Sequence, residues 1–233
     1  EELPGIIADG ICEAANTFPD ETGLGWDRWH PKVVCRLSPQ LVQLLGTILM
    51  ECESSGCWSE GVGLVLIALL EKSDGGFRPI GLLPTKPRLW MRTRRILAKQ
   101  WEAKHQRPWL YAGKGKGANV AAWIQAATAE RAAALRPSVE YAQALMDLVK
   151  AFDMVPRWLL VQEAVALGYP LRILRLSIAT YSLERVIRIG SVISKSVWAS
   201  RGITAGSGFA TTEMRLVMLR VVDRACKLYP LIV

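Results

Sequence analysis

The sequence contains no two consecutive aspartates, only two histidines, and no apolar run longer than the nine residues 62–70. A membrane-spanning helix needs about 20 apolar residues, so we expect no membrane partner. Five cysteines are scattered, and no second pair completes a zinc set with Cys52 and Cys57. The first residues, "EELPGIIADG", do not resemble a secretion signal. We therefore expect reduced thiols and an intracellular protein of the nucleus or cytoplasm, not a secreted one.

Acidic residues are nearly missing from residues 78–116, where Glu102 is the one acid against eleven lysines and arginines. The net charge of the whole chain is +8, so all the excess positive charge lies in this stretch. Such a stretch indicates a polyanion partner, either nucleic acid or nucleotide phosphates, or else a solvated basic surface. Spacing predicts a helix over about 89–107 with Arg92, Arg95 and Lys99 on one face. This face is either plain surface or a template contact.

Local signals predict an α+β protein in which antiparallel hairpins pack with helices. Ser38 and Pro39 begin a helix that ends at Gly56. Two apolar runs around Asp74-Gly75-Gly76 predict one hairpin, and alternation around Gly190-Ser191 predicts a second. Four tryptophans on expected helices are predicted to belong to the core: Trp90, Trp101, Trp123 and Trp158.

The stretch "ALMDLVKAFDMVPRWLL" spans residues 144–160, and the apolar run over 140–147 predicts a buried strand that ends at Asp147. A carboxylate there must be hydrogen-bonded, paired or bound to a cation. In phosphoryl transfer, carboxylates hold the Mg²⁺ ions that clamp the reacting oxygens. A structural role is the commoner one for such a residue taken alone. Asp153, just ahead of Pro156, is predicted to cap the next helix.

Other side chains suit the remaining parts of a nucleotide site. Lys72 and Arg78 flank the tip of the first hairpin, and arginine grips phosphate oxygens in a bidentate manner. Phe152 would place a bulky ring near Asp147. The loop "GITAGSG" can present amide groups to a nucleic-acid backbone. Each residue also has a plainer interpretation: Lys72 is a solvent-exposed hairpin residue, Arg78 is an ion-paired residue of the sheet, and Phe152 belongs to the core.

Four stretches occur in a fixed order: "CWSEGVGLVLIALLEKSDGGFRPIGLL", "GKGKGANVAAW", "ALMDLVKAFDMVPRWLL" and "RGITAGSGFATTEM". Together they resemble the reverse transcriptase domain of non-LTR retrotransposons and, more distantly, group II intron reverse transcriptases. The resemblance covers about Trp58 to Met214, and four ordered motifs are far more specific than one. It implies a right-hand polymerase, with a helical lead-in over 1–57, fingers over 58–136 and a partial palm over 137–233.

The resemblance also implies roles for single residues in an RNA-directed DNA polymerase, a nucleotidyltransferase that uses two Mg²⁺ ions. Asp147 and the carbonyl of Leu148 would bind metal. Phe152 would lie under the deoxyribose, and Lys72 and Arg78 would contact the deoxynucleoside triphosphate. The RNA template and DNA primer would meet the remaining candidates: Arg201, Gly206, Ser207, Arg92, Arg95 and Lys99.

The chain departs from the family pattern in three places. Ala205 stands where the family usually has Gln, and Gly117 and Ala118 replace the usual Ser or Thr. The aromatic-x-Asp-Asp motif is missing, and the sequence stops at Val233, about where its strand would start. We therefore expect a fragment without polymerase activity of its own. The alternatives are a polymerase-derived protein that binds RNA without catalysis, and an unrelated basic α+β protein.

Overall fold

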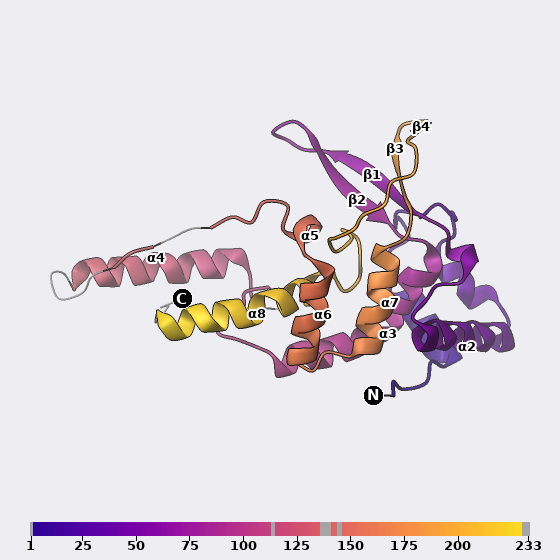
Figure 1. Cartoon of the computed structure of the whole chain (residues 1–233), viewed down its shortest axis with the longest axis horizontal. Coiled ribbons are helices and arrows are strands. Elements are labelled where there is room, and N and C mark those ends of the chain that lie inside the picture. The colour runs from indigo at the N-terminus through magenta and orange to yellow at the C-terminus, as the bar shows by residue number, and fades with distance from the viewer. Residues whose placement is uncertain (1, 113–114, 136–140, 144–145, 230–233) are drawn as a thin grey trace.

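The computed structural model describes residues 2–112, 115–135, 141–143 and 146–229. One mixed sheet lies at an edge of the molecule, and its first hairpin projects beyond the helices (Figure 1). The described elements follow in chain order: α1 (Ala8–Asn16), η1 (Pro31–Arg36), α2 (Pro39–Ser55), η2 (Glu60–Val62), β1 (Val65–Glu71), β2 (Phe77–Leu82), α3 (Thr85–Lys104), α4 (Ala118–Ala134), α5 (Ala151–Met154), α6 (Arg157–Ala166), α7 (Leu171–Tyr181), β3 (Arg185–Ile189), β4 (Val192–Ile193) and α8 (Ala210–Leu228).

Both predicted hairpins form, and they join into one sheet with the strand order β2-β1-β3-β4. Strands β1 and β2 are antiparallel, as are β3 and β4, whereas β1 and β3 run parallel. Gly75, Gly76 and Gly190 supply the positive φ angles of the turns. The parallel pairing places Leu66 opposite Val186. It therefore unites strands from the expected fingers region and the expected palm region.

Local sequence explains where α2 begins and ends. Ser38 Oγ accepts a hydrogen bond from the Leu41 amide (3.4 Å), and Gly56 ends α2 in the left-handed conformation. The prediction for Asp153 is wrong. This residue lies inside the short helix α5, and α6 begins at Pro156 without a side-chain cap. Asp153 cannot cap α6 because it belongs to the helical turn of α5, which ends just before Pro156.

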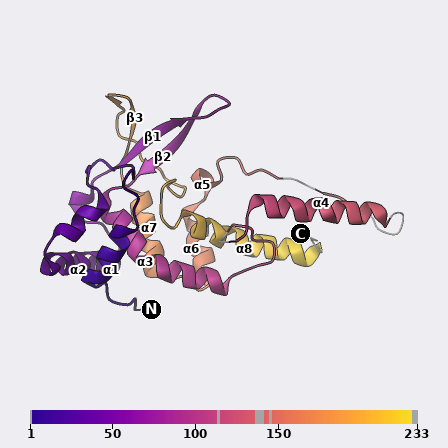
Figure 2. The ribbon, with the colours of Figure 1, turned by 180° about the vertical axis from the view of Figure 1, so that it is seen from behind.

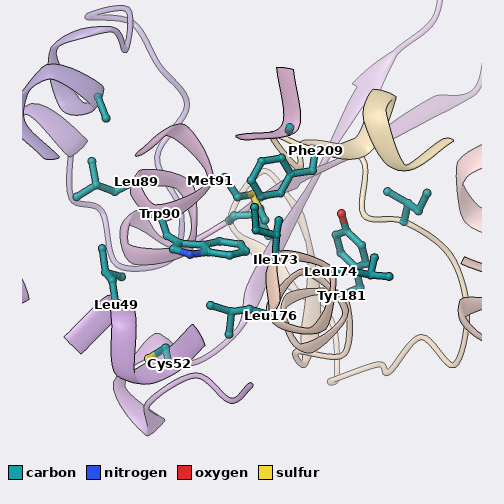
Figure 3. Packing of buried hydrophobic residues seen from close by; sticks show 14 of the residues in the cluster. Leu49, Cys52, Leu89, Trp90, Met91, Ile173, Leu174, Leu176, Tyr181 and Phe209 are labelled. Atoms are coloured by element: carbon teal, nitrogen blue, oxygen red, sulfur yellow. The ribbon is translucent and has the colours of Figure 1, made fainter. Parts of the chain in front are cut away.

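The core lies where α2, α3 and α7 meet the start of α8. Trp90 is completely buried there and makes edge-on contacts with Trp58 and Phe209, at centroid distances of 5.6 and 5.4 Å. Figure 3 shows Trp90 and Phe209 within this core. The prediction of core positions for Trp90 and Trp101 is confirmed. It is wrong for two other tryptophans, which are 76% and 68% exposed: Trp123 on α4 and Trp158 on α6.

The exposure of Trp123 follows from the position of α4. This alanine-rich helix extends away from the rest of the molecule in both views (Figures 1 and 2), and among its described side chains only Ala132 is buried. Helical periodicity placed Trp123 on a helix correctly, but it did not show what the helix packs against. No described helix is both long enough and apolar enough to cross a bilayer.

The strand predicted over 140–147 does not form at its described positions. Residues 141–143 and 146–148 are outside any strand, while 140, 144 and 145 lie outside the described residues. Met146 is 91% exposed and Asp147 is exposed beside it. No described strand pairs with this segment, and of its described apolar side chains Tyr141 is partly buried while Ala142 and Met146 are exposed. The α+β class is confirmed, with β1 to β4 as the described strands.

Candidate nucleic-acid and nucleotide site

Backbone hydrogen bonds join α5 and the residues after it to the glycine-rich loop that precedes α8. The amide of Gly202 donates to the carbonyl of Val155 (2.8 Å), and the amide of Ile203 donates to the carbonyl of Phe152 (2.9 Å). Gly202 has a φ of 89°, and a Cβ there would lie 2.6 Å from the Asp153 carbonyl oxygen. Glycine alone combines this φ with so close an approach. The stretches "AFDMVP" and "RGITAGSG" therefore form one packed unit.

The end of β2 joins the same loop from the other side. The amide of Gly81 donates to the carbonyl of Ala205 (2.7 Å). Gly206 has a φ of 107°, and a Cβ there would lie 2.2 Å from the Gly81 carbonyl oxygen. Three of the four stretches that carry the resemblance thus meet through main-chain contacts, although they are far apart in the sequence.

The two predicted metal ligands precede this unit in the chain. Asp147 and Leu148 are exposed, and within the described part of the chain the Asp147 carboxylate has no ion-pair or hydrogen-bond partner. Phe152 is half-buried and packs against the core. The carboxylate is therefore free to bind a cation, but no strand of the described residues fixes its position.

The two predicted triphosphate contacts lie together at the tip of the first hairpin. Arg78 is opposite Leu70 in the β1–β2 pair, and the amide of Lys72 closes the turn by donating to the Gly76 carbonyl (3.1 Å). Both side chains are exposed and line an open hollow of about 460 Å³ together with Glu71 and Asp74. The tip therefore offers two cations to solvent, partly offset by two carboxylates.

The predicted basic face of α3 lines a second hollow, of about 320 Å³, which we call the basic hollow. Arg92, Arg95 and Lys99 form one side of it, and the loop glycines Gly206 and Gly208 form the other. The structure thus brings together the helix face and the loop that the sequence proposed as separate nucleic-acid contacts. Its complete lining is Phe18, Thr22, Arg88, Met91, Arg92, Arg95, Ala98, Lys99, Gly206, Gly208, Thr211 and Thr212.

Arg88 and Arg92 are held beside the Phe18 ring, and among the described residues neither has a carboxylate within ion-pair distance. Arg88 donates to the Gly23 carbonyl and to Thr22 Oγ1, both at 2.7 Å, and its guanidinium lies 5.1 Å from the Phe18 ring centre. Arg92 lies 4.5 Å from the same ring. Burial lowers the pKa of both groups, and the neighbouring Arg95 lowers that of Arg92 further. For Arg88, the charge of Asp27 opposes this lowering in part. Positive charge therefore gathers at the basic hollow, with Asp27 as its partial counterweight.

Other cations of the basic stretch have structural roles. Arg94 is buried and donates to both carboxylate oxygens of Glu53, at 2.5 and 2.6 Å. Arg107 pairs with Asp223 at 3.0 Å. Lys99 lines the basic hollow but also contacts Glu102 at 2.5 Å. The charge available to a polyanion is therefore smaller than the sequence count suggests, and three of the remaining cations line the basic hollow: Arg88, Arg92 and Arg95.

The three loop residues that were predicted to contact nucleic acid do not all face the same way. Gly206 is exposed to the basic hollow, and Arg201 is exposed at the start of the loop. Ser207 turns inward, where its Oγ lies 2.8 Å from the Tyr181 hydroxyl and accepts a hydrogen bond from the Phe209 amide (3.1 Å). Ser207 thus fixes the loop from inside, and it does not face the basic hollow.

Sequence reasoning missed the contribution of the first 57 residues. Phe18 and Thr22 precede the resemblance, yet they form part of the wall of the basic hollow and position Arg88. No local pattern signals this, because the contact depends on how the lead-in packs against α3. The repeat of Arg88 with Arg92 and Arg95 at helical spacing was the one usable sequence signal.

The comparisons with known proteins add no assignment. No protein-family model matches this chain, and no match to a curated protein is found. Among the described residues, no group of three or more His, Cys, Asp or Glu side chains is placed to hold a metal ion.

Proposed function

We propose that this chain is the nucleic-acid-binding and nucleotide-binding part of an RNA-directed DNA polymerase, similar to the reverse transcriptases of non-LTR retrotransposons. The supporting observation is the convergence of three motif stretches on one loop, through the hydrogen bonds Gly81–Ala205, Gly202–Val155 and Ile203–Phe152. Chance matches scattered over an unrelated fold have no reason to meet in this way. The arrangement of fingers and partial palm belongs to the same proposal.

In this proposal the hairpin tip binds the triphosphate of an incoming deoxynucleotide. Lys72 and Arg78 present cations at one open hollow, where arginine can engage two phosphate oxygens at once. Phe152, packed beside the loop, provides the apolar surface for the deoxyribose. The hairpin extends well beyond the helices (Figure 1), which suits a finger that closes over a nucleotide.

The basic hollow binds the phosphate backbone of the template or primer. Arg92 and Arg95 supply charge from α3, and Gly206 brings main chain close to the ligand without side-chain obstruction. Phosphate contacts of this kind position a nucleic acid without reading its sequence. A polymerase that copies any template requires such binding.

For metal binding, we propose only two ligands from this chain, Asp147 and Leu148. A carboxylate at Asp147 and a carbonyl at Leu148 are oxygen donors of the kind that Mg²⁺ prefers. A two-ion centre needs further carboxylates, and the described residues contain no group of three candidate ligands. They do not make up a two-ion centre by themselves. For this chain we therefore propose binding and positioning of substrates, with Asp147 as one metal ligand.

Binding of a DNA primer annealed to a longer RNA template tests the proposal by fluorescence anisotropy. The variant Arg92→Ala/Arg95→Ala is expected to bind at least about tenfold more weakly than the parent chain. Arg131→Ala is the control, because Arg131 is exposed on the projecting helix α4, away from the basic hollow. Equal affinity of the parent chain and the double variant would refute the assignment of the basic hollow.

A second function, RNA binding without catalysis, is favoured by one feature of the loop. At Ala205 the carbonyl is occupied by Gly81 and the side chain is a methyl group, so no polar side chain is offered to a base. Primer extension on RNA with Mg²⁺, by this chain and by a longer polypeptide that contains it, separates the two functions. Extension by either one supports the polymerase, and tight binding without extension by both supports the binder.

A further inference from the structure

A fully buried carboxyl group lies directly behind the loop that borders the basic hollow. Glu213, in the first turn of α8, has no exposed surface, and the same is true of Tyr181 at the end of α7. The Tyr181 hydroxyl donates a hydrogen bond to Glu213 Oε2. A carboxyl group in such surroundings is costly to keep, and it has no cation partner among the described residues. Because Glu213 lies next to the loop, it can hold the loop in position through hydrogen bonds.

The hydrogen bonds run in one direction from the loop to the carboxyl group. The Tyr181 hydroxyl has a single proton, which it donates to Glu213, so it is the acceptor in the 2.8 Å contact with Ser207 Oγ. The same Ser207 Oγ lies 3.7 Å from the Met91 sulfur, a weaker acceptor that lines the basic hollow. Ser207 Oγ in turn accepts from the Phe209 amide at 3.1 Å. The loop backbone is therefore connected to Glu213 through two hydroxyl groups. Figure 3 shows Tyr181 and Phe209 in the core that encloses this chain of bonds.

The loop fastened in this way is the one that faces the basic hollow. Gly206 and Gly208, on either side of Ser207, line the hollow, while Ser207 points into the protein. The Gly208 amide is also held, by the Met91 sulfur at 3.3 Å. Any loosening of Ser207 would therefore displace the main chain that borders the hollow.

We propose that Tyr181 and Glu213 are positioning residues that hold the Ser207 loop in the conformation required for nucleic-acid binding, and that ionisation of Glu213 releases it. The proposal rests on the proposed function of the basic hollow. When the carboxyl group loses its proton, the buried charge lacks a neutralising partner among the described residues. Opening of the loop lets water reach the charge, and the surface that borders the hollow is lost.

Burial raises the pKa of Glu213 to about 8, and the hydroxyl groups of Tyr181 and Ser177 lower it only in part. The other groups that face this cluster are Tyr181 itself, Tyr169 before α7 and Glu102 of α3. Arg157 and Arg185 also donate to the Tyr181 carbonyl, at 2.7 and 3.1 Å, and arginine stays protonated over this pH range. Burial raises the pKa of both tyrosines well above 10. Burial also tends to raise the pKa of Glu102, but Lys99 and its other partners outweigh that effect and lower it. Among the described groups facing the cluster, Glu213 alone therefore titrates between pH 6 and 9.

Amide hydrogen exchange of the peptide that contains residues 206–209 tests this mechanism directly. In the parent chain, protection corrected for intrinsic exchange is expected to fall about tenfold per pH unit above pH 8. Glu213→Gln keeps the shape and an acceptor oxygen but cannot ionise, so its protection should not change with pH. Identical pH profiles for the parent chain and this variant would overturn the proposal.

Two further measurements separate this proposal from the proposed function. Tyr181→Phe removes only the connecting hydroxyl, and it should lower loop protection already at pH 6.5 while the chain stays folded. Primer–template affinity of the parent chain should fall from pH 7 to pH 9, and that of Glu213→Gln should not. If exchange behaves as expected but no variant binds nucleic acid, the proposed function fails and the positioning of the loop stands. If binding occurs with pH-independent exchange, the positioning mechanism fails alone.

Discussion

The amide of Gly81, near the end of β2, donates a 2.7 Å hydrogen bond to the carbonyl of Ala205 in the loop before α8. This contact fixes the hairpin strand against the loop, and the adjoining Gly206 leaves no room for a side chain between them. The position of the loop, and of the basic hollow beside it, therefore depends on the absence of a Cβ at Gly206, as well as at Gly81 and Gly202.

Gly206→Ala is expected to destabilise the fold by more than about 2 kcal/mol, from an unfavourable φ and a clash with the Gly81 carbonyl. Gly75→Ala is the matched control. Gly75 also has a positive φ, of 85°, but a Cβ there meets no atom within 4 Å, so the loss should stay near 1 kcal/mol. Chemical denaturation measures both. Equal losses would show that the close approach at Gly206 is relieved by movement of the loop.

Local elements of the fold could be predicted because their signals are local. The caps of α2, the glycine turns of both hairpins and the position of Trp90 all follow from a few neighbouring residues. The parallel pairing of β1 with β3 did not follow, because it depends on how distant segments pack. The strand predicted to end at Asp147 failed for the same reason. An apolar run forms a strand only where another strand pairs with it.

The sequence predicted many residues of the candidate site, but it did not predict how those residues are arranged in space. Helical spacing correctly placed Arg92, Arg95 and Lys99 on one face, and the loop glycines were marked by composition. Sequence could not show that the helix face and the loop line the same hollow. It also could not show that Phe18 completes the wall. Each of these facts depends on tertiary packing.

Breaking the buried pair Glu53–Arg94 should be strongly destabilising, although Arg94 belongs to the basic stretch. Glu53 also accepts a hydrogen bond from Trp90 Nε1 at 2.6 Å, so its removal leaves three buried donor nitrogens, one of Trp90 and two of Arg94, without this acceptor. Glu53→Ala is expected to cost about 3–5 kcal/mol in thermal or chemical denaturation. The comparison is Asp20→Ala, which breaks an exposed ion pair with Lys32 and should change stability little. A small effect of Glu53→Ala would mean that water reaches Arg94.

Affinity for nucleic acid should fall steeply with salt, because binding by lysine and arginine releases counterions from phosphates. The logarithm of the binding constant should decline linearly with the logarithm of salt concentration. For Arg92→Gln/Arg95→Gln the slope should be shallower by about 2, one unit for each lost phosphate contact. Arg131→Gln should keep the parent slope. An unchanged slope for the double variant would place the bound phosphates elsewhere.

The stability of the fold should depend on pH through Glu213. Because burial raises the pKa of Glu213 from 4.5 to about 8 in the folded chain, unfolding releases this proton between those two values. Stability from this group is therefore fully present below pH 4.5 and is lost progressively up to about pH 8, by an amount on the order of a few kcal/mol. Denaturation at pH 5, 7 and 9 measures the loss. In Glu213→Gln this component should be missing, so the variant should become more stable relative to the parent as pH rises.

Asp147 offers a test in which catalysis and stability separate cleanly. The side chain is exposed and has no partner within the described residues, so Asp147→Asn should leave the melting temperature unchanged. If Asp147 is a metal ligand, the same substitution should abolish Mg²⁺-dependent primer extension in any polypeptide that contains this chain and is active. It should also leave primer–template affinity without Mg²⁺ unchanged, because that affinity comes from the basic hollow.

Asp153→Asn is the matched control and should keep both the extension activity and the melting temperature, since Asp153 is a neighbouring exposed carboxylate that lies inside α5. Full activity of Asp147→Asn would remove Asp147 from the proposed site, and a large drop in its melting temperature would assign it a structural role.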